Sequence, residues 1–154
     1  MALKVDDSGV IVACPGCQQS NRLTFGKLDA QPRCARCKQQ IPLLSQPVEI
    51  ASVTAFDALI TTAPVPVLVD FWAPWCGPCH AVAPEVDKVA YSLRGRLVAA
   101  KVNTDALGEL GARYSVRSIP TLAVFRDGRE TGRVSGAIPA AEILKLVDQS
   151  HQRL

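Results

Sequence analysis

The sequence has no run of apolar residues long enough to cross a membrane. The longest such stretches, 64–69 and 121–125, are far shorter than the roughly 20 residues that a transmembrane helix needs. The first residues, MALKVDDSGVIVACPGC, also lack the basic segment and the long apolar segment of an export signal. We therefore expect no membrane association and a cytoplasmic location.

Internal repeats and low-complexity segments are absent too, and the excess of charge is small. A length of 154 residues, 48% hydrophobic and 20% charged, fits one globular domain or one domain with a small extra module. The formal net charge is +3. All of this excess lies in residues 1–46, which contain six Lys or Arg against three Asp and also hold four of the six cysteines.

No cysteine lies outside a Cys-x-x-Cys pair. The pairs are Cys14 and Cys17, Cys34 and Cys37, and Cys76 and Cys79. Such a pair closes too small a loop to link distant segments, so a disulfide framework is not favoured. The first two pairs are sixteen residues apart, which is typical of zinc sites, and two facing pairs supply four thiolates at tetrahedral corners. We predict one Zn²⁺ there, structural or regulatory, and no organic cofactor.

The N-terminal segment has few large apolar side chains, and segments this short usually need a metal or disulfides to fold. Many zinc ribbons have Gly after each Cys pair, whereas Gln18 and Lys38 occupy these positions here. Two alternatives are that the four thiols form switchable disulfides or that they are a structural relic that binds no metal. Nucleic-acid binding is not expected, because four thiolates with one Zn²⁺ carry −2 and reduce the charge of the segment from +3 to +1.

Pro42 and Pro47 bracket a predicted linker, so we expect a zinc ribbon with its linker at 1–46 and a second domain at 47–154. In the second domain, strand patterns at 48–51, 65–71, 97–102, 121–125 and 130–135 alternate with helical patterns, and Asp127-Gly128 indicates a hairpin between the last two strands. The helices are expected from Ser52 or Thr54 to about 61, at 76–93, at 106–114 and after Pro139. This βαβαβαββα order predicts an α/β fold with a mixed sheet.

The third cysteine pair lies where a buried strand gives way to a helix. Unpaired N–H groups and the positive end of the helix dipole stabilise an anionic sulfur there, and Cys76 is nearest to that end. Cys79, one turn later, is placed to attack Cys76 once Cys76 is bonded to another sulfur. A zinc site is not favoured, because this pair has no partner pair, with His80 adjacent and His151 distant in sequence.

The stretch VLVDFWAPWCGPC, followed in order by KVNTD, VRSIPT, FRDGRE and Gly136, resembles the thioredoxin family over residues 48–150. With the four-cysteine segment in front, the chain resembles the zinc-ribbon-bearing bacterial type of that family. The resemblance implies a thioredoxin fold, in which helices flank a mixed central sheet, preceded by a small N-terminal zinc ribbon.

The resemblance also implies roles for individual residues. An exposed Cys76 attacks a target disulfide, and Cys79 resolves the mixed disulfide. Asp70 matches the buried carboxylate that shuttles a proton for the second cysteine, and Lys101 matches the lysine beside it. An alternative role for Asp70 is that of a strand acid with a satisfied hydrogen bond. Pro120 matches the cis-proline that lies opposite the sulfur atoms.

A flat apolar rim is implied as the place where a partner docks, with Trp72 packed underneath. Its substrate-binding residues are Trp75, Gly77, Pro78, Ile119 and Gly136, together with Ala73 and Pro74. His80 is a departure, because the family usually has Lys or Arg just after the second cysteine. It is either an exposed helix residue with little effect or a group that tunes the redox poise between about pH 6 and 8.

We therefore predict a protein-disulfide reductase, a thiol-disulfide oxidoreductase that NADPH-dependent thioredoxin reductase recycles. Gly-Pro between the cysteines favours reduction, since oxidising relatives generally carry His there. The expected partners are disulfide-containing proteins and the reductase, with no nucleic acid and no membrane, and the chain is expected to be a monomer. The alternative function is that of a zinc-dependent redox sensor or a binding or holdase module.

Overall fold

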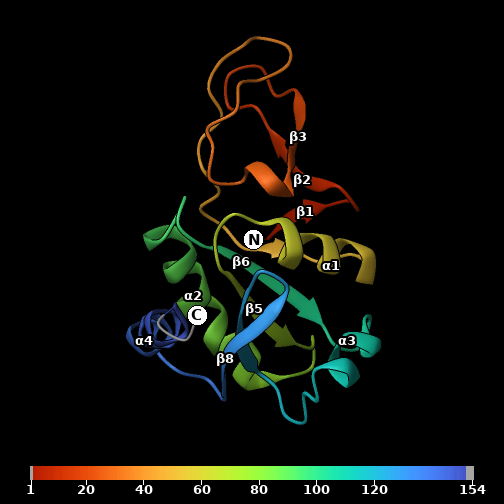
Figure 1. The fold of residues 1–154 in the computed structure, drawn as a ribbon, viewed down its shortest axis with the longest axis vertical. Coiled ribbons are helices and arrows are strands. Elements are labelled where there is room, and N and C mark those ends of the chain that lie inside the picture. Colours follow the sequence, from red (N-terminus) through yellow and green to blue (C-terminus); the bar gives the residue numbers. More distant parts are fainter. Residues whose placement is uncertain (1, 152–154) are drawn as a thin grey trace.

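The computed structural model describes residues 2–151 and is elongated, with the N-terminal segment at one end (Figure 1). The strands are β1 (Leu3–Val5), β2 (Gly9–Ala13), β3 (Ser20–Thr24), β4 (Val48–Glu49), β5 (Val67–Trp72), β6 (Val98–Asn103), β7 (Thr121–Arg126) and β8 (Arg129–Ser135). The helices are the short 3₁₀ helix η1 (Phe25–Lys27) and the α-helices α1 (Val53–Thr62), α2 (Gly77–Ser92), α3 (Gly108–Arg113) and α4 (Ala140–His151). None of the helices in the described chain is both long and apolar enough to cross a membrane.

All strands belong to one mixed sheet with the order β3-β2-β1-β4-β6-β5-β7-β8. The central strand β5 is parallel to β6 and antiparallel to β7, which confirms the predicted mixed sheet. Apolar residues of α2 and α4 cover one face, and those of α1 and α3 cover the other. The thioredoxin fold predicted for the second domain is therefore present, and its core lies on both faces of β5.

Local sequence signals explain where the elements begin and end. Ser52 caps α1, because its Oγ accepts a hydrogen bond from the backbone N–H of Ala55 at 3.0 Å. Asp127 and Gly128, both at positive φ, form the predicted turn between β7 and β8. Two elements are shorter than the sequence predicted: β4 has only two residues, and α3 begins at Gly108 because the side chain of Asn103 caps the preceding turn.

The N-terminal segment is not separated from the rest by a free linker. Its first strand, β1, pairs in parallel with β4, and the N–H of Leu3 donates to the carbonyl of Pro47 at 2.8 Å. Phe25 and Ile41 belong to the same buried apolar cluster as residues of α1 and β5. The division at 46/47 stays a prediction, and its outer ends at residues 1 and 152–154 lie outside the described residues.

Candidate functional site

The third cysteine pair lies at the start of α2, as the sequence predicted. Cys76 is the N-cap of the helix, its Sγ accepts a hydrogen bond from the N–H of Cys79 at 3.2 Å, and the two cysteines form a disulfide. Gly77 and Pro78 occupy the first helical turn, where a missing proline N–H costs nothing. The helix dipole and this N–H therefore favour an anionic sulfur on Cys76 once the disulfide is reduced.

One expectation about this pair needs correction for the disulfide form. The resemblance implied an exposed Cys76, but Cys76 is only 4% exposed and Cys79 only 2%. Cys76 is buried because its sulfur is bonded to Cys79 and lies 3.7 Å from the carbonyl oxygen of Ile119. In the disulfide form, Cys76 therefore presents little surface to an attacking thiolate.

An exposed aromatic ring, a cis-proline and a glycine surround the disulfide. The Ile119-Pro120 peptide bond is cis, and the carbonyl of Pro120 accepts a hydrogen bond from the N–H of Gly136 at 2.8 Å. Gly136 has φ +98°, which favours glycine, and a Cβ built there would meet no atom within 4 Å. Trp75 is 70% exposed and, with Ile119, lines a hollow of about 310 Å³ that extends to α3. The structure thus brings these predicted rim residues together.

Sequence reasoning missed a residue that holds the rim. Asp105, just before the helix predicted at 106–114, accepts a hydrogen bond at Oδ2 from the indole N–H of Trp75 at 2.9 Å. Asn103 caps the turn before α3, through Oδ1 and the N–H groups of Asp105 and Ala106. The only available signal was the position of Asp105 at the end of KVNTD, just past the carboxyl end of a strand next to β5.

Asp70 is fully buried in β5, and neither carboxylate oxygen has a hydrogen-bond partner among residues 2–151. The alternative of an acid with a satisfied hydrogen bond is therefore wrong for this conformation. Burial raises the pKa of Asp70 from 3.8 to about 7, Lys101 opposes this rise, and Glu49 and Asp87 add to it. Lys101 lies directly opposite Asp70 in the β5–β6 register. Asp70 can therefore take up or release a proton near neutral pH.

His80, the departure from the family pattern, is exposed and contacts the loop that precedes α2. Its Nε2 lies 2.7 Å from the carbonyl oxygen of Pro74, and its ring meets the ring of Trp72 at 6.4 Å in an edge-on arrangement. The side chain of Trp72 is half-buried.

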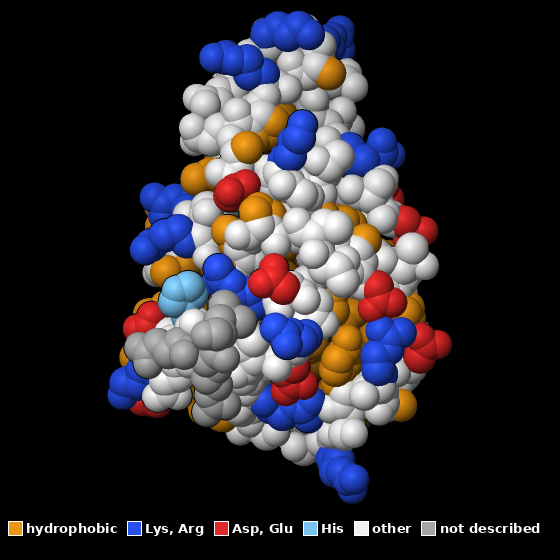
Figure 2. All heavy atoms as spheres, in the orientation of Figure 1, with side chains coloured by type: hydrophobic (Ala, Val, Ile, Leu, Met, Phe, Trp, Pro, Cys, Tyr) orange, Lys and Arg blue, Asp and Glu red, His pale blue; other side chains and the backbone are white. Residues whose placement is uncertain are grey.

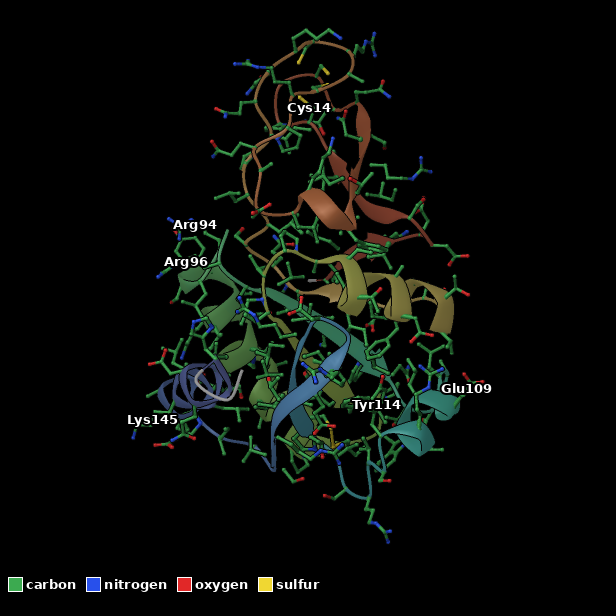
Figure 3. The ribbon with its side chains drawn as sticks, viewed as in Figure 1. Cys14, Arg94, Arg96, Glu109, Tyr114 and Lys145 are labelled. Atoms are coloured by element: carbon green, nitrogen blue, oxygen red, sulfur yellow. A yellow bond between two sulfur atoms is a disulfide. The ribbon has the colours of Figure 1, made fainter. Side chains whose placement is uncertain are left out.

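The four N-terminal cysteines form a second sulfur site at the other end of the molecule. In Figure 3, Cys14 lies at the top of the view, in the N-terminal segment, whereas the disulfide is drawn toward the bottom. The four Sγ atoms lie within 4.8 Å of one another, and the distances are 3.6 Å for Cys14–Cys37 and 3.7 Å for Cys17–Cys34. Tetrahedral zinc with Zn–S bonds of about 2.3 Å places its sulfur ligands about 3.8 Å apart. The donor set therefore fits one zinc ion.

Hydrogen bonds to its sulfur favour the thiolate form of Cys34. Cys34 Sγ accepts from the N–H of Arg36 at 3.4 Å and from the side-chain amide of Asn21 at 3.5 Å. The N–H of Cys37, followed by those of Arg36 and Asn21, lowers the pKa of Cys34 to about 6 although burial opposes the shift. Lys and Arg side chains gather on the surface of this end of the molecule (Figure 2), which is consistent with its positive charge.

The two Cys pairs of the ribbon adopt the same turn despite the missing glycines. Gln18 and Lys38, which follow the pairs, both have φ +67°. The N–H of Gln18 donates to the carbonyl of Cys14 at 2.9 Å, and that of Lys38 donates to the carbonyl of Cys34 at 3.0 Å. The side chains at these two positions thus tolerate the left-handed conformation that glycine adopts without strain.

Comparisons with known proteins agree with both sites. The thioredoxin family model matches residues 46–149, and a model described as the N-terminal region of thioredoxin 2, a zinc ribbon, matches residues 13–39. Thioredoxin C-3 from Corynebacterium nephridii is 38% identical over 144 residues, which cover 94% of this chain and 97% of that protein. Thioredoxin 1 from a Nostoc species is 43% identical over 96 residues, which cover 62% of this chain and 90% of that protein.

A solved structure extends the likeness to three dimensions. An N21Q mutant thioredoxin from Halobacterium salinarum NRC-1 superimposes with a TM-score of 0.63 at 30% sequence identity, covering 69% of this chain and 91% of that one. The redox-active Cys76–Cys79 disulfide lies within the part of the sequence that the thioredoxin family model matches. The chain belongs to the thioredoxin family of protein-disulfide oxidoreductases and carries out dithiol-disulfide exchange.

Proposed function

We propose that the protein acts as a reductant of disulfides in other proteins and is itself re-reduced by thioredoxin reductase at the expense of NADPH. The observation that carries this proposal is the Cys76–Cys79 disulfide at the start of α2, which lies next to a cis-proline and follows the strand β5 with its buried acid Asp70. Reduction rather than oxidation of targets is supported by Gly77-Pro78 between the cysteines.

The proposed reaction has two steps. The Cys76 thiolate attacks a target disulfide, forms a Cys76–target disulfide and releases the first target thiolate. Asp70 then accepts the proton of the Cys79 thiol, and the Cys79 thiolate attacks Cys76 and releases the second target thiolate. The target gains two electrons and the protein ends as the Cys76–Cys79 disulfide. Two electrons from NADPH, delivered by the reductase, restore the dithiol.

The residues around the disulfide support two roles in substrate docking: an apolar contact surface and a backbone hydrogen-bonding site. The exposed ring of Trp75, with Ile119, Gly77, Pro78 and Gly136, offers an apolar surface to an extended substrate segment. Pro120 in the cis form leaves the backbone of Ile119 facing Cys76, with the carbonyl oxygen 3.7 Å from Sγ. An incoming segment can therefore hydrogen-bond to backbone while its disulfide meets Cys76.

We also propose that Cys14, Cys17, Cys34 and Cys37 hold one structural zinc ion. When bound, the ion cross-links the two Cys turns and stabilises the ribbon, because four thiolates then share one divalent charge. Pairing of β1 with β4 supports a structural role, since the ribbon extends the same sheet that carries Asp70. Reduced zinc ligands are expected in a reducing compartment, which supports a cytoplasmic location and a monomer without intermolecular disulfides.

The test joins turnover to metal content in one preparation. Native mass spectrometry counts the bound zinc, and insulin reduction coupled to thioredoxin reductase and NADPH measures activity. Cys76→Ser is expected to abolish turnover, whereas Cys79→Ser is expected to accumulate mixed disulfides that dithiothreitol releases. Normal turnover by Cys76→Ser would refute the proposal. If peroxide released the zinc and turnover changed in proportion to the zinc lost, the redox-sensor alternative would be favoured over a structural ion.

A further inference from the structure

Four charged residues lie in register on neighbouring strands of the sheet. Lys4 on β1 pairs with Glu49 on β4, Glu49 pairs with Lys101 on β6, and Lys101 pairs with Asp70 on β5. Paired residues on adjacent strands point to the same face, and their Cβ atoms are about 5 Å apart. The row therefore alternates in sign and leads from the ribbon to the buried acid of the dithiol site.

Trp72 ties the middle of this row together. Its indole N–H donates to Oε2 of Glu49 at 3.4 Å, and the ammonium nitrogen of Lys101 lies 4.6 Å from the centre of its ring. Glu49, Trp72 and Lys101 thus form a group around one ammonium, held by a hydrogen bond and a cation–π contact. The same Trp72 ring meets His80, the residue after Cys79. Glu49 is therefore connected through one side chain to the start of α2.

Lys101 pairs in register with two acids, Glu49 and Asp70, and of these only Glu49 accepts a side-chain hydrogen bond among the described residues. Glu49 is half-buried and accepts from Trp72, whereas Asp70 is fully buried and accepts from nothing among the described residues. The charged groups that act on the pKa of Asp70 are Lys101 from β6, which lowers it, and Glu49 from β4 and the exposed Asp87 from α2, which raise it. From β7 the residue opposite Asp70 is Leu122, which is uncharged, and Lys4 lies exposed beyond Glu49.

We propose that Glu49 is a positioning residue of the dithiol centre, whose carboxylate holds Trp72 against Lys101 and whose charge makes the Asp70 carboxylate a stronger acceptor for the proton of the Cys79 thiol. This inference rests on the proposed role of Asp70 as the proton acceptor. Because the charge of Glu49 opposes ionisation of Asp70, its removal leaves Lys101 to stabilise the Asp70 carboxylate alone. Asp70 would then ionise at lower pH and become a weaker base for the Cys79 thiol.

The test uses two variants and one matched control in the full-length protein. Glu49→Gln removes the charge but keeps an oxygen for the indole N–H of Trp72, and Glu49→Asp keeps the charge on a shorter side chain. Glu142→Gln, an exposed glutamate paired with Lys145 on α4, is the control. The readouts are the ¹³C titration of the Asp70 carboxyl and the pH profile of insulin reduction with dithiothreitol as reductant.

Glu49→Gln is expected to lower the titration midpoint of Asp70 by roughly 0.5 to 1 pH unit, as expected for a unit charge about two strand spacings away. The acid limb of the insulin-reduction profile should move in the same direction. Glu49→Asp should restore most of the wild-type midpoint, and Glu142→Gln should leave it unchanged. A purely structural role would lower the melting temperature of Glu49→Gln and leave the Asp70 midpoint where it is, which would overturn the inference.

The two readouts separate this inference from the proposed function. The carboxyl titration requires no turnover, so a shifted midpoint in a protein that fails to reduce insulin would support the role of Glu49 and refute the proposed function. Normal insulin reduction by the wild type with an unmoved Asp70 midpoint in folded Glu49→Gln would refute the role of Glu49 alone.

Discussion

The ribbon and the dithiol site use the same Cys-x-x-Cys spacing for opposite purposes. In both, the first cysteine begins a tight turn and its sulfur accepts a hydrogen bond from a backbone N–H, at 3.4 Å for Cys14 and 3.2 Å for Cys76. In both, the carbonyl of that cysteine accepts from the N–H four residues later, that of Gln18 or of His80. The two motifs therefore share a tight turn, although the sulfur of Cys14 accepts from the second following residue, Gly16, and that of Cys76 from the third, Cys79.

The difference begins with the residue that follows the motif. At Gln18 the backbone turns to φ +67° and the chain returns as strand β3, so that the two sulfurs face a second turn of the same kind. At His80 the chain continues as α2, and the two sulfurs have only each other as partners. A left-handed residue thus leads to a metal-binding set, whereas a helix leads to a redox pair.

Removal of the metal should have the largest effect, because it should reduce amide protection in the ribbon and not in the region of the dithiol site. Zinc binding to four thiolates is coupled to folding by about 10 kcal/mol or more in small ribbons. Treatment with a strong chelator is therefore expected to abolish amide protection in β2 and β3 while protection in β5 and β6 persists. Hydrogen exchange read by mass spectrometry measures both regions in one experiment.

The control for this prediction is Cys76→Ser/Cys79→Ser, which removes the redox sulfurs and should lose ribbon protection to the same extent. Equal loss of protection in β2 and in β5 after chelation would show that the ribbon and the rest unfold as one unit. Unchanged protection in β2 would show that the ribbon does not depend on metal.

The next effect concerns Asp70, which has no counterpart in the ribbon. Its folded pKa is about 7 and its ordinary value is 3.8, so the folded state retains a proton that the unfolded state loses between these values. The free energy of unfolding therefore falls as the pH rises through this window, by about 4 kcal/mol in total. Asp70→Asn should remove this loss, and urea unfolding at pH 5 and pH 8 measures the part above pH 5, about 3 kcal/mol.

Asp70→Asn should at the same time slow insulin reduction by about 100-fold at pH 7, because an amide cannot accept the Cys79 proton. Asp148→Asn, which changes an exposed acid on α4, should alter neither property. If Asp70→Asn were less stable than the wild type at pH 8, the buried Asp70 carboxylate would not be destabilising, which would contradict the prediction.

Much of this comparison was available from the sequence. Spacing alone separated the zinc pairs from the redox pair, and the predicted strands and helices agree with the structure to within a few residues, because buried strands and capped helices leave strong local patterns. The fold and the zinc-fitting cysteine set followed from these patterns and from the resemblance.

The residues that sequence reasoning missed act through contacts between distant segments. The position of Glu49 between Lys4 and Lys101 depends on the pairing of β4 with β1 and β6. A two-residue strand has no sequence pattern from which this pairing could be predicted. The contact of Asp105 with Trp75 could not be predicted, because Trp75 lies in a loop 30 residues earlier in the chain. The continuity of the ribbon with the main sheet was missed for the same reason.

The smallest predicted effect tests the left-handed residues themselves. An L-residue at φ +67° costs about 1–2 kcal/mol relative to glycine, and the greater freedom of glycine in the unfolded chain returns part of this. Gln18→Gly is therefore expected to stabilise the zinc-bound ribbon by about 0.5–1 kcal/mol, which corresponds to a two- to fivefold gain in zinc affinity. Competition with a chromophoric chelator measures the gain.

Lys38→Gly should gain less than Gln18→Gly, because the ammonium of Lys38 donates to the carbonyl of Ala35 at 2.8 Å and this exposed contact is lost. Gln19→Gly is the matched control: Gln19 adjoins Gln18 but is not among the residues with positive φ, so glycine there should weaken zinc binding. If Gln18→Gly and Gln19→Gly weakened zinc binding equally, the left-handed turn would carry no cost that glycine relieves. The residue after each Cys pair would then have to act on the metal through its side chain instead of through the backbone.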